Sequence, residues 1–319
     1  MKLKRPFVPV LPAAFITLAL AAGAAHAAEP ASCANVRMAS PGWTDIDATN
    51  AIFGVVLKGL GYQQTIQNVS VPITYQGLRK GQIDAFLGNW MPAQGPMVKP
   101  LIAEKAIEVL QPNLPSAKFT LAVPAYVAEA GVRSFADLNK FADRFDKKIY
   151  GIEPGAPANQ NIQKMLEGKS FGMDGWKLVE SGETAMLTQV ERFVRDKKFV
   201  VFLAWEPHLM NTRYKLAYLS GGDDYFGPNY GAASVNTVVR PGYVDACPNV
   251  GKLFQQVVFT VDMENTLITA MMADKVPGPA AAAAALKANP APLDSWLAGV
   301  TTRDGGDGLA AVRKSIGLN

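Results

Sequence analysis

Short apolar runs alternate with segments of helical periodicity along most of the chain. The run at residues 36–39 predicts a strand, and apolar positions spaced three and four apart over residues 45–60 predict the helix that follows. Later, an amphipathic helical pattern over 183–197 precedes a continuous apolar run at 199–204, which is typical of a strand buried on both faces. Strands that alternate with helices in this way predict mostly parallel sheets covered by helices.

The alternation occurs twice, with a break near residues 112–125, and the last third of the chain is largely helical. We therefore expect an α/β fold of two lobes, each a mostly parallel sheet flanked by helices. The first lobe is discontinuous (28–120 plus 225–319), and the second (121–224) is inserted into it. The remaining predicted strands lie at 65–69, 84–87, 107–110, 120–123, 148–151 and 177–180, and the remaining helices at 74–80, 134–145 and 158–166.

The beginning of the chain departs from this pattern. Lys2, Lys4 and Arg5 precede an apolar stretch over residues 7–22, and a small-residue Ala-His-Ala sequence follows it. This is the pattern of a secretory signal peptide, so we predict a cleaved signal at residues 1–27 and export to the periplasm. Removing its three positive charges lowers the formal charge of the chain from +4 to +1.

The composition of the predicted mature chain excludes several classes of protein. A near-neutral chain lacks the Lys and Arg excess of a nucleic-acid binder, so we expect no nucleic-acid partner. His208 is the one histidine left after the signal, which excludes a multi-histidine metal centre and makes any Ser-His-Asp triad depend on it. No later apolar stretch reaches the roughly 18 residues of a membrane span. We expect a monomer that needs no cofactor and no metal.

Two cysteines, Cys33 and Cys247, remain after the signal, and their spacing fits neither a C-x-x-C redox motif nor a zinc site. In an oxidising periplasm such a pair most often forms a structural disulfide, which adds up to about 5 kcal/mol of stability in the chain-entropy model. The alternative makes Cys33 a lipid-anchored N-terminus, although residues 29–32 before it lie outside the apolar segment. We favour the disulfide.

Three of the five tryptophans follow predicted strands. Ligands of open parallel sheets bind beyond the carboxyl ends of the strands, where Trp43, Trp90 and Trp205 lie; Trp176 and Trp296 stand where ordinary packing explains them. A single loop Trp is more often packing than a ligand contact, but a core has no reason to collect three at equivalent positions. Aromatic faces are the preferred receptor for a quaternary ammonium, and three or four contacts of about 2 kcal/mol each account for a micromolar affinity.

Six segments carry a resemblance to a known family, in the same order and over nearly the whole predicted mature chain. They resemble the choline-binding proteins of ABC importers, which belong to the glycine betaine and choline group of periplasmic substrate-binding proteins. The resemblance implies a two-lobed, type II binding protein that closes around its ligand, with an ABC permease and its ATPase as partners. The segments are GWTDI (42–46), GNWMP (88–92), YGIEPG (150–155), WEPH (205–208), GGDDYFGPNYG (221–231) and CPNVGK (247–252).

The resemblance also assigns ligand-binding residues. Trp43, Trp90 and Trp205 match three walls of the family's aromatic box, and Asp45 matches the acidic residue that receives the hydroxyl of the ligand. A carboxylate at this position would repel glycine betaine or carnitine by several kcal/mol at roughly 4–5 Å, whereas it accepts a hydrogen bond from choline. The alternative for Asp45 is an N-cap, because it opens a predicted helix. The two roles are compatible.

Two positions differ from the choline-binding pattern. Phe119 stands where choline binders have a Tyr, so the fourth ring of the box is kept and its phenol oxygen is lost. Ala156 stands where they have an Asn, so an amide at the hydroxyl end of the ligand is lost and room is left for an ester such as acetylcholine. The resemblance therefore implies choline as the ligand, with acetylcholine, glycine betaine and carnitine as alternatives.

An enzyme is the alternative from another class. Asp45, Glu153 and Glu206 are carboxylates at strand ends around an aromatic cleft, as a carbohydrate-active hydrolase would show. Glu153 and Glu206 each precede a proline, however, and are explained as well by a role in their turns. The one G-x-S-x-G sequence, at 168–172, follows a predicted helix and not a strand, so it is no nucleophile elbow, and the chain has no P-loop and no G-x-G-x-x-G after a strand. We therefore predict the solute-binding component of an ABC transporter and not an enzyme.

Overall fold

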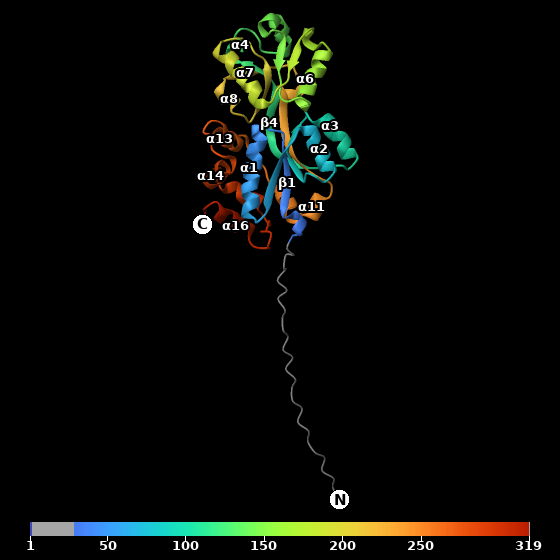
Figure 1. The fold of residues 1–319 in the computed structure, drawn as a ribbon, viewed down its shortest axis with the longest axis vertical. Helices are drawn as coiled ribbons and strands as arrows, with labels where there is room; N and C mark the ends of the chain where they lie inside the picture. Colours follow the sequence, from blue (N-terminus) through green and yellow to red (C-terminus); the bar gives the residue numbers. More distant parts are fainter. Residues whose placement is uncertain (2–28, 319) are drawn as a thin grey trace.

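The computed structural model describes Met1 and residues 29–318, so the predicted signal peptide after its first residue lies outside the described part of the chain. The described residues form a mixed α/β structure of two lobes stacked along the long axis (Figure 1). We call the lower half in that view the first lobe and the upper half the second lobe. Among the described helices, none is long and apolar enough to cross a membrane.

The first lobe contains both ends of the described chain. Strand β1 pairs in parallel with β2 and β3, as the alternation of strands and helices predicts. Its elements before the crossing strands are β1 (Asn35–Ser40), α1 (Thr44–Gly59), β2 (Gln63–Asn68), α2 (Val71–Arg79), β3 (Ala85–Met91) and α3 (Gly95–Ala103). Its C-terminal helices are α11 (Tyr243–Ala246), α12 (Pro248–Gln256), α13 (Val261–Met272), α14 (Gly278–Ala288), α15 (Ala291–Trp296) and α16 (Gly308–Ser315).

The second lobe has a smaller parallel core, in which β5 pairs with β6 and β7. Its strands are β5 (Lys148–Tyr150), β6 (Lys177–Val179), β7 (Phe202–Glu206) and the short β8 (Leu216–Tyr218). Its helices are α4 (Ala125–Glu129), α5 (Phe135–Leu138), α6 (Pro157–Glu167), α7 (Glu183–Arg195) and α8 (Met210–Arg213), and the short helices α9 (Asp223–Phe226) and α10 (Pro228–Gly231) follow where the chain returns toward the first lobe.

Two long strands run from one lobe to the other. Strands β4 (Glu108–Pro124) and β9 (Ala232–Val239) pair antiparallel and join both lobes into one sheet of order β2-β1-β3-β9-β4-β7-β5-β6, with β8 beside β4. The sequence predicts two separate strands in place of β4 and does not predict β9. The pairing is therefore parallel in the outer strands of each lobe and antiparallel where β3, β9, β4 and β7 meet.

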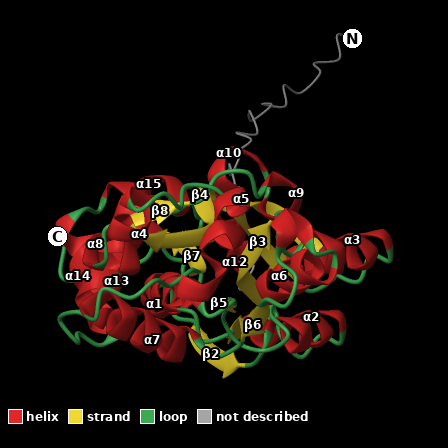
Figure 2. Cartoon of the chain, turned by 90° about the horizontal axis from the view of Figure 1, so that it is seen from above, coloured by secondary structure: helices red, strands yellow, loops and turns green. Residues whose placement is uncertain are grey.

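Helices cover both faces of the sheet. Seen along the long axis, α1, α7, α13 and α14 lie on one side of the strands and α2, α3 and α6 on the other (Figure 2). The apolar face of α1 is buried, and Phe53 on this helix stacks on Phe254 of α12 with ring centroids 4.3 Å apart. This contact packs the C-terminal helices against the N-terminal part of the chain.

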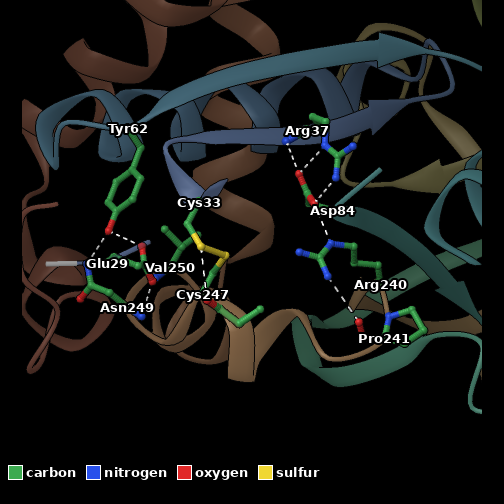
Figure 3. Close-up of a disulfide and its surroundings, with 11 residues drawn as sticks. Glu29, Cys33, Arg37, Tyr62, Asp84, Arg240, Pro241, Cys247, Asn249 and Val250 are labelled. Carbon is green, nitrogen blue, oxygen red and sulfur yellow. Dashed lines mark hydrogen bonds and ion pairs between the residues drawn. A yellow bond between two sulfur atoms is a disulfide. The ribbon is translucent and has the colours of Figure 1, made fainter. Parts of the chain in front are cut away.

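A disulfide links Cys33 and Cys247, as predicted, although 214 residues separate them in sequence (Figure 3). Their Cα atoms lie 5.7 Å apart, within the range that a disulfide spans. Glu29 reinforces the same junction, because its carboxylate accepts hydrogen bonds from the N–H groups of Asn249 and Val250. The N-terminus of the described chain is therefore fixed to α12.

Candidate functional site

A cavity between the two lobes collects the aromatic residues that the sequence singles out. Trp43, Asp45, Trp90, Phe119 and Trp205 all line it, and each is at least nine-tenths buried. Both lobes and the crossing strand β4 contribute walls. The remaining lining residues are Ala93, Gln94, Ile152, Pro157 and Ala158.

The backbone explains how four rings meet there. Trp43 is the N-cap residue of α1, immediately after the turn that follows β1. Trp90 and Trp205 lie near the carboxyl ends of β3 and β7 and are still paired with neighbouring strands. Hydrogen bonding of β3 to β9 and of β7 to β4 extends these strands beyond the apolar runs that predict them. Phe119 on β4 is the direct antiparallel partner of Trp205, and its ring centroid lies 6.2 Å from that of Trp90.

Carboxylates fix two of the indole rings at their N–H edges. The Nε1–H of Trp90 donates to Asp45 Oδ2 at 3.1 Å. The Nε1–H of Trp43 donates to both oxygens of Glu153, at 3.1 and 3.0 Å, across the interface between the lobes. Burial raises the pKa of Glu153, and this hydrogen bond opposes the shift. Each bond sets the orientation of a ring that faces the cavity.

Asp45 is the titratable group among the described lining residues, and it is only 1% exposed. Burial raises its pKa to about 8, the negative charge of Glu183 adds to the shift, and the hydrogen bond from Trp90 opposes it. The second oxygen, Oδ1, has no hydrogen-bond partner among the described residues. A buried oxygen of this kind is costly unless a donor reaches it. The cavity thus presents one unsatisfied acceptor amid aromatic faces.

The second polar side chain in the wall, Gln94, is already satisfied. Its Nε2 donates to the carbonyl of Gly88 at 2.7 Å, and its Oε1 accepts from the hydroxyl of Tyr75 at 2.6 Å. Among the described lining residues, Asp45 alone therefore has a buried side-chain oxygen without a partner. This leaves a single acceptor to fix the polar end of a ligand.

A second buried carboxyl group, that of Glu264, lies behind the wall near Asp45. Burial, with the charge of Asp45 added, raises the pKa of Glu264 on α13 well above its usual value.

Helix α1 begins at Thr44 with Trp43 as N-cap, so the alternative that makes Asp45 the N-cap is wrong. The turn before α1 is bent by Gly42 at positive φ, which starts the helix one residue earlier than expected.

Ala156 does not line the cavity. It is the buried N-cap residue of α6, whereas its neighbours Ile152, Pro157 and Ala158 form the wall on that side. Proline at the first helical position fixes this entry into the helix. The sequence pattern therefore finds the correct loop and misses which of its side chains face inward.

The carboxylates of the hydrolase alternative do not gather in the cavity. Glu206 lies outside the lining, is 38% exposed and approaches Lys118 at 3.9 Å. Glu153 is engaged by Trp43, and of the three only Asp45 lines the cavity. In the described part of the chain, no group of three or more His, Cys, Asp or Glu side chains is placed to hold a metal ion.

Sequence reasoning missed the polar contacts around the aromatic wall. Glu183, at the start of α7, accepts hydrogen bonds from Thr44 of α1 although 139 residues separate them. His208 lies behind it, with Nε2 3.2 Å from Glu183 Oε1. The one sequence signal was a glutamate at the beginning of a strongly amphipathic helix, which does not reveal a partner in the other lobe.

A two-lobed α/β fold with an aromatic cavity between the lobes defines the class of substrate-binding proteins. The family described as the substrate binding domain of ABC-type glycine betaine transport systems matches residues 34–288. The chain belongs to this family, and it is therefore a substrate-binding component of ABC-type transport.

Two curated relatives match parts of the chain. It is 48% identical over 128 residues to the uncharacterized protein ORF1 of Chromohalobacter salexigens, which covers 40% of this chain and 83% of that protein. It is 27% identical over 164 residues to the glycine betaine/carnitine transport binding protein GbuC of Listeria monocytogenes, and these cover 51% of this chain and 53% of that protein. The chain therefore spans about half the length of the second relative.

Solved structures match over a larger share of the chain. An ABC-transporter choline binding protein in complex with choline is 48% identical, with a TM-score of 0.89, over 91% of this chain and 100% of that one. An ABC-transporter choline binding protein in an unliganded semi-closed conformation is also 48% identical, with a TM-score of 0.82, over 90% and 100%. The described arrangement is thus more similar to the choline complex.

Proposed function

We propose that this protein captures choline in the periplasm and delivers it to the permease of an ABC importer, whose ATPase drives uptake. The cationic trimethylammonium group lies among Trp43, Trp90, Phe119 and Trp205. The hydroxyl of the ligand donates to Asp45. The lobes close over the ligand, and the closed form is the one the permease receives.

The observation that carries this proposal is the unpaired Oδ1 of Asp45 in an aromatic cavity. A quaternary ammonium has no N–H, so ring faces bind it better than a polar pocket does, at about 2 kcal/mol for each desolvated contact. A bound cation favours the ionised form of Asp45, which then attracts it. A hydroxyl on the ligand removes the cost of the unpaired oxygen, because it supplies the missing donor.

The same oxygen disfavours the alternative ligands. Acetylcholine has no hydroxyl and leaves Oδ1 without a donor. Glycine betaine and carnitine carry a carboxylate, which the ionised Asp45 repels. The space expected from Ala156 gives acetylcholine no advantage, since Ile152, Pro157 and Ala158 form the wall there. Choline satisfies both the rings and the carboxylate.

The similarity to solved structures supports the same ligand class. The choline complex is 48% identical to this chain over nearly its whole length, whereas a glycine betaine complex of lactococcal OpuAC is 25% identical with a TM-score of 0.75. Four of the five lining residues that the resemblance assigns keep the residue type of choline binders, with Phe119 as the exception.

Calorimetric titration of the mature protein, freed of ligand by unfolding and refolding, tests the proposal. Choline, acetylcholine, glycine betaine and carnitine are titrated in parallel. We expect choline to bind with micromolar or better affinity and glycine betaine to bind at least tenfold more weakly. Preferred binding of glycine betaine or carnitine would contradict the assigned role of Asp45 while leaving the aromatic box in place.

The assignment of the lobes is part of the same proposal. We place the second lobe at 121–224 and the discontinuous first lobe at 28–120 plus 225–319, with β4 and β9 as the crossing segments. A monomer is sufficient, because both lobes of one chain enclose the cavity. N-terminal sequencing of the periplasmic form tests the signal at 1–27, with cleavage expected before Ala28.

A further inference from the structure

The N-terminus of α1 has no cap from its own lobe. Trp43 occupies the N-cap position and provides no capping oxygen. The N–H of Thr44 instead donates to Glu183 Oε2 at 3.0 Å, and the hydroxyl of Thr44 donates to Glu183 Oε1. Glu183 is the first residue of α7 in the second lobe. A carboxylate from one lobe therefore caps a helix of the other.

Glu183 is held in place from behind. It is 4% exposed, and His208 of the same lobe lies 3.2 Å from its Oε1. The Nδ1 of His208 accepts a hydrogen bond from the N–H of Met210 at 3.0 Å, so the proton of a neutral ring is on Nε2 and points to Glu183. His208 of the second lobe thus helps to orient this carboxylate toward Thr44.

The capped turn is the turn that carries the ligand-binding residues. Trp43 precedes Thr44 and Asp45 follows it, and Glu153, also of the second lobe, accepts the indole N–H of Trp43. Two carboxylates of the second lobe therefore reach one turn of the first lobe. Both contacts exist only when the lobes are together.

We propose that Glu183 is a positioning residue for ligand capture: by capping α1 across the interface, it makes closure of the lobes and the placement of Trp43 and Asp45 a single event. This inference rests on the proposed function. The proximity of several carboxylates also favours a cationic ligand. Closure brings Glu183 toward Asp45, and a positive charge in the cavity offsets the repulsion between them.

Thr44→Pro and Glu183→Gln remove the contact from opposite sides. Proline at the first helical position removes both donors of Thr44 and is favoured there, and the extended backbone of Trp43 (φ −92°, ψ 135°) suits a residue before proline. Glu183→Gln keeps the shape of the side chain and an oxygen for His208. Glu191→Gln is the matched control, since Glu191 lies on the same helix and pairs with Arg213 at the surface of the second lobe.

The experiment measures three quantities for each protein: the choline dissociation constant, the fraction of closed molecules by fluorescence transfer between labels on the two lobes, and the unfolding midpoint without choline. We expect Thr44→Pro and Glu183→Gln to bind choline about 10–100-fold more weakly than the wild type, because a charge-assisted hydrogen bond is lost. Their closed fraction falls with and without choline. We expect their unfolding midpoints without choline to equal that of the wild type, because most choline-free molecules are open and lack the contact.

Wild-type affinity and closed fraction in both variants would overturn the inference. A choline-free unfolding midpoint that falls in step with the affinity would also overturn it, because it would give Glu183 a role in folding only. If the wild type itself binds no choline, the proposed function fails separately, and the closed fraction of the choline-free variants still decides the role of Glu183.

Discussion

Two buried aspartates of the first lobe, Asp45 and Asp84, are in opposite situations. Asp84 accepts hydrogen bonds from the backbone N–H and guanidinium of Arg37 and from the guanidinium of Arg240, at 2.7–2.9 Å (Figure 3). Burial alone would raise its pKa, but these donors outweigh burial and lower it. Asp45 has one indole donor and an unpaired oxygen, and burial raises its pKa to about 8.

The difference separates the support of the fold from the capture of the ligand. Asp84 is satisfied by the protein, so its ionised form stabilises the folded state. Asp45 is not satisfied, so its ionised form disfavours the closed, empty cavity until a ligand brings a cation and a hydroxyl. A carboxylate that is costly without its ligand is what a binding site needs, because the gain appears only on binding.

The largest expected effect concerns Asp84. Asp84→Ala leaves two guanidinium groups without their shared carboxylate, so we expect the free energy of unfolding to fall by about 3 kcal/mol. The affinity of the remaining folded protein for choline stays unchanged. Urea unfolding with choline titration measures both. The matched control is Asp294→Ala, which removes a surface partner of Arg313 and should lower the free energy of unfolding far less; equal losses would contradict the contrast.

Trp205→Ala removes one wall of the cavity. We expect choline to bind at least about tenfold more weakly, because a desolvated cation–π contact is lost. Trp205→Phe keeps a ring and should lose less. Trp176→Phe, at a residue that does not line the cavity, serves as the control and should bind as the wild type does. An unchanged affinity for Trp205→Ala would remove this residue from the box.

Asp45→Asn tests the proposed hydrogen bond from the ligand hydroxyl to Asp45. We expect a loss of about tenfold or more for choline and a smaller loss for tetramethylammonium, which has the same cation and no hydroxyl. Calorimetry with both ligands gives the ratio. Equal losses would mean that Asp45 acts only by its charge.

The same variant sharpens the contrast with Asp84. Closure of the empty cavity raises the pKa of Asp45, so closure without ligand becomes less favourable as the pH rises from the unshifted value of about 4 toward 8. Asp45→Asn should therefore raise the closed fraction of the choline-free protein at neutral pH, measured by fluorescence transfer between the lobes. A lower closed fraction would show that Asp45 stabilises the closed lobes without a ligand.

The affinity for choline should depend on pH. The ligand favours ionised Asp45, so protonation competes with binding, and the affinity falls by up to about tenfold for each pH unit below the pKa near 8. The negative charge of Glu183 adds to the raised pKa of Asp45 and so moves this dependence to higher pH. Titration between pH 6 and pH 9 measures the slope, which Asp45→Asn should flatten. An equal slope in the variant would assign the titration to another group.

The smallest expected effect is that of Phe119→Tyr. The ring face is already present in the wild type, so adding the phenol oxygen should change choline affinity by less than about threefold. Gly231→Ala is the contrasting variant at the same wall. A Cβ there would lie 2.0 Å from the carbonyl oxygen of Phe119, so the strand must move, and we expect a larger loss than for the tyrosine. A larger change in choline affinity for Phe119→Tyr would show that the residue at position 119 contributes to binding by more than its ring face.

The sequence predicted the residues of the aromatic wall because a strand end is a local feature. Apolar runs mark where β1, β3 and β7 lie, and Trp43, Trp90 and Trp205 stand beside their carboxyl ends. Phe119 and Asp45 came from the resemblance to choline binders. The disulfide followed from the presence of just two cysteines in the predicted mature chain. Local pattern and composition were therefore sufficient for the three tryptophans and the disulfide.

Contacts between distant segments were beyond such reasoning. Two prolines and several polar residues interrupt the apolar pattern inside β4, whereas pairing with β9 and β7 keeps the strand continuous. The direction of Ala156 depends on where α6 begins, which no apolar run marks. The cap that Glu183 provides for α1 depends on the packing of the two lobes, and the local sequence of neither segment predicts contact with the other.

A structure of the choline complex tests the central claim most directly. The account predicts the trimethylammonium group among Trp43, Trp90, Phe119 and Trp205, with the hydroxyl oxygen about 2.5–3.0 Å from Asp45 Oδ1. A hydroxyl directed instead toward the N-terminus of α6, with Oδ1 still unpaired, would contradict it.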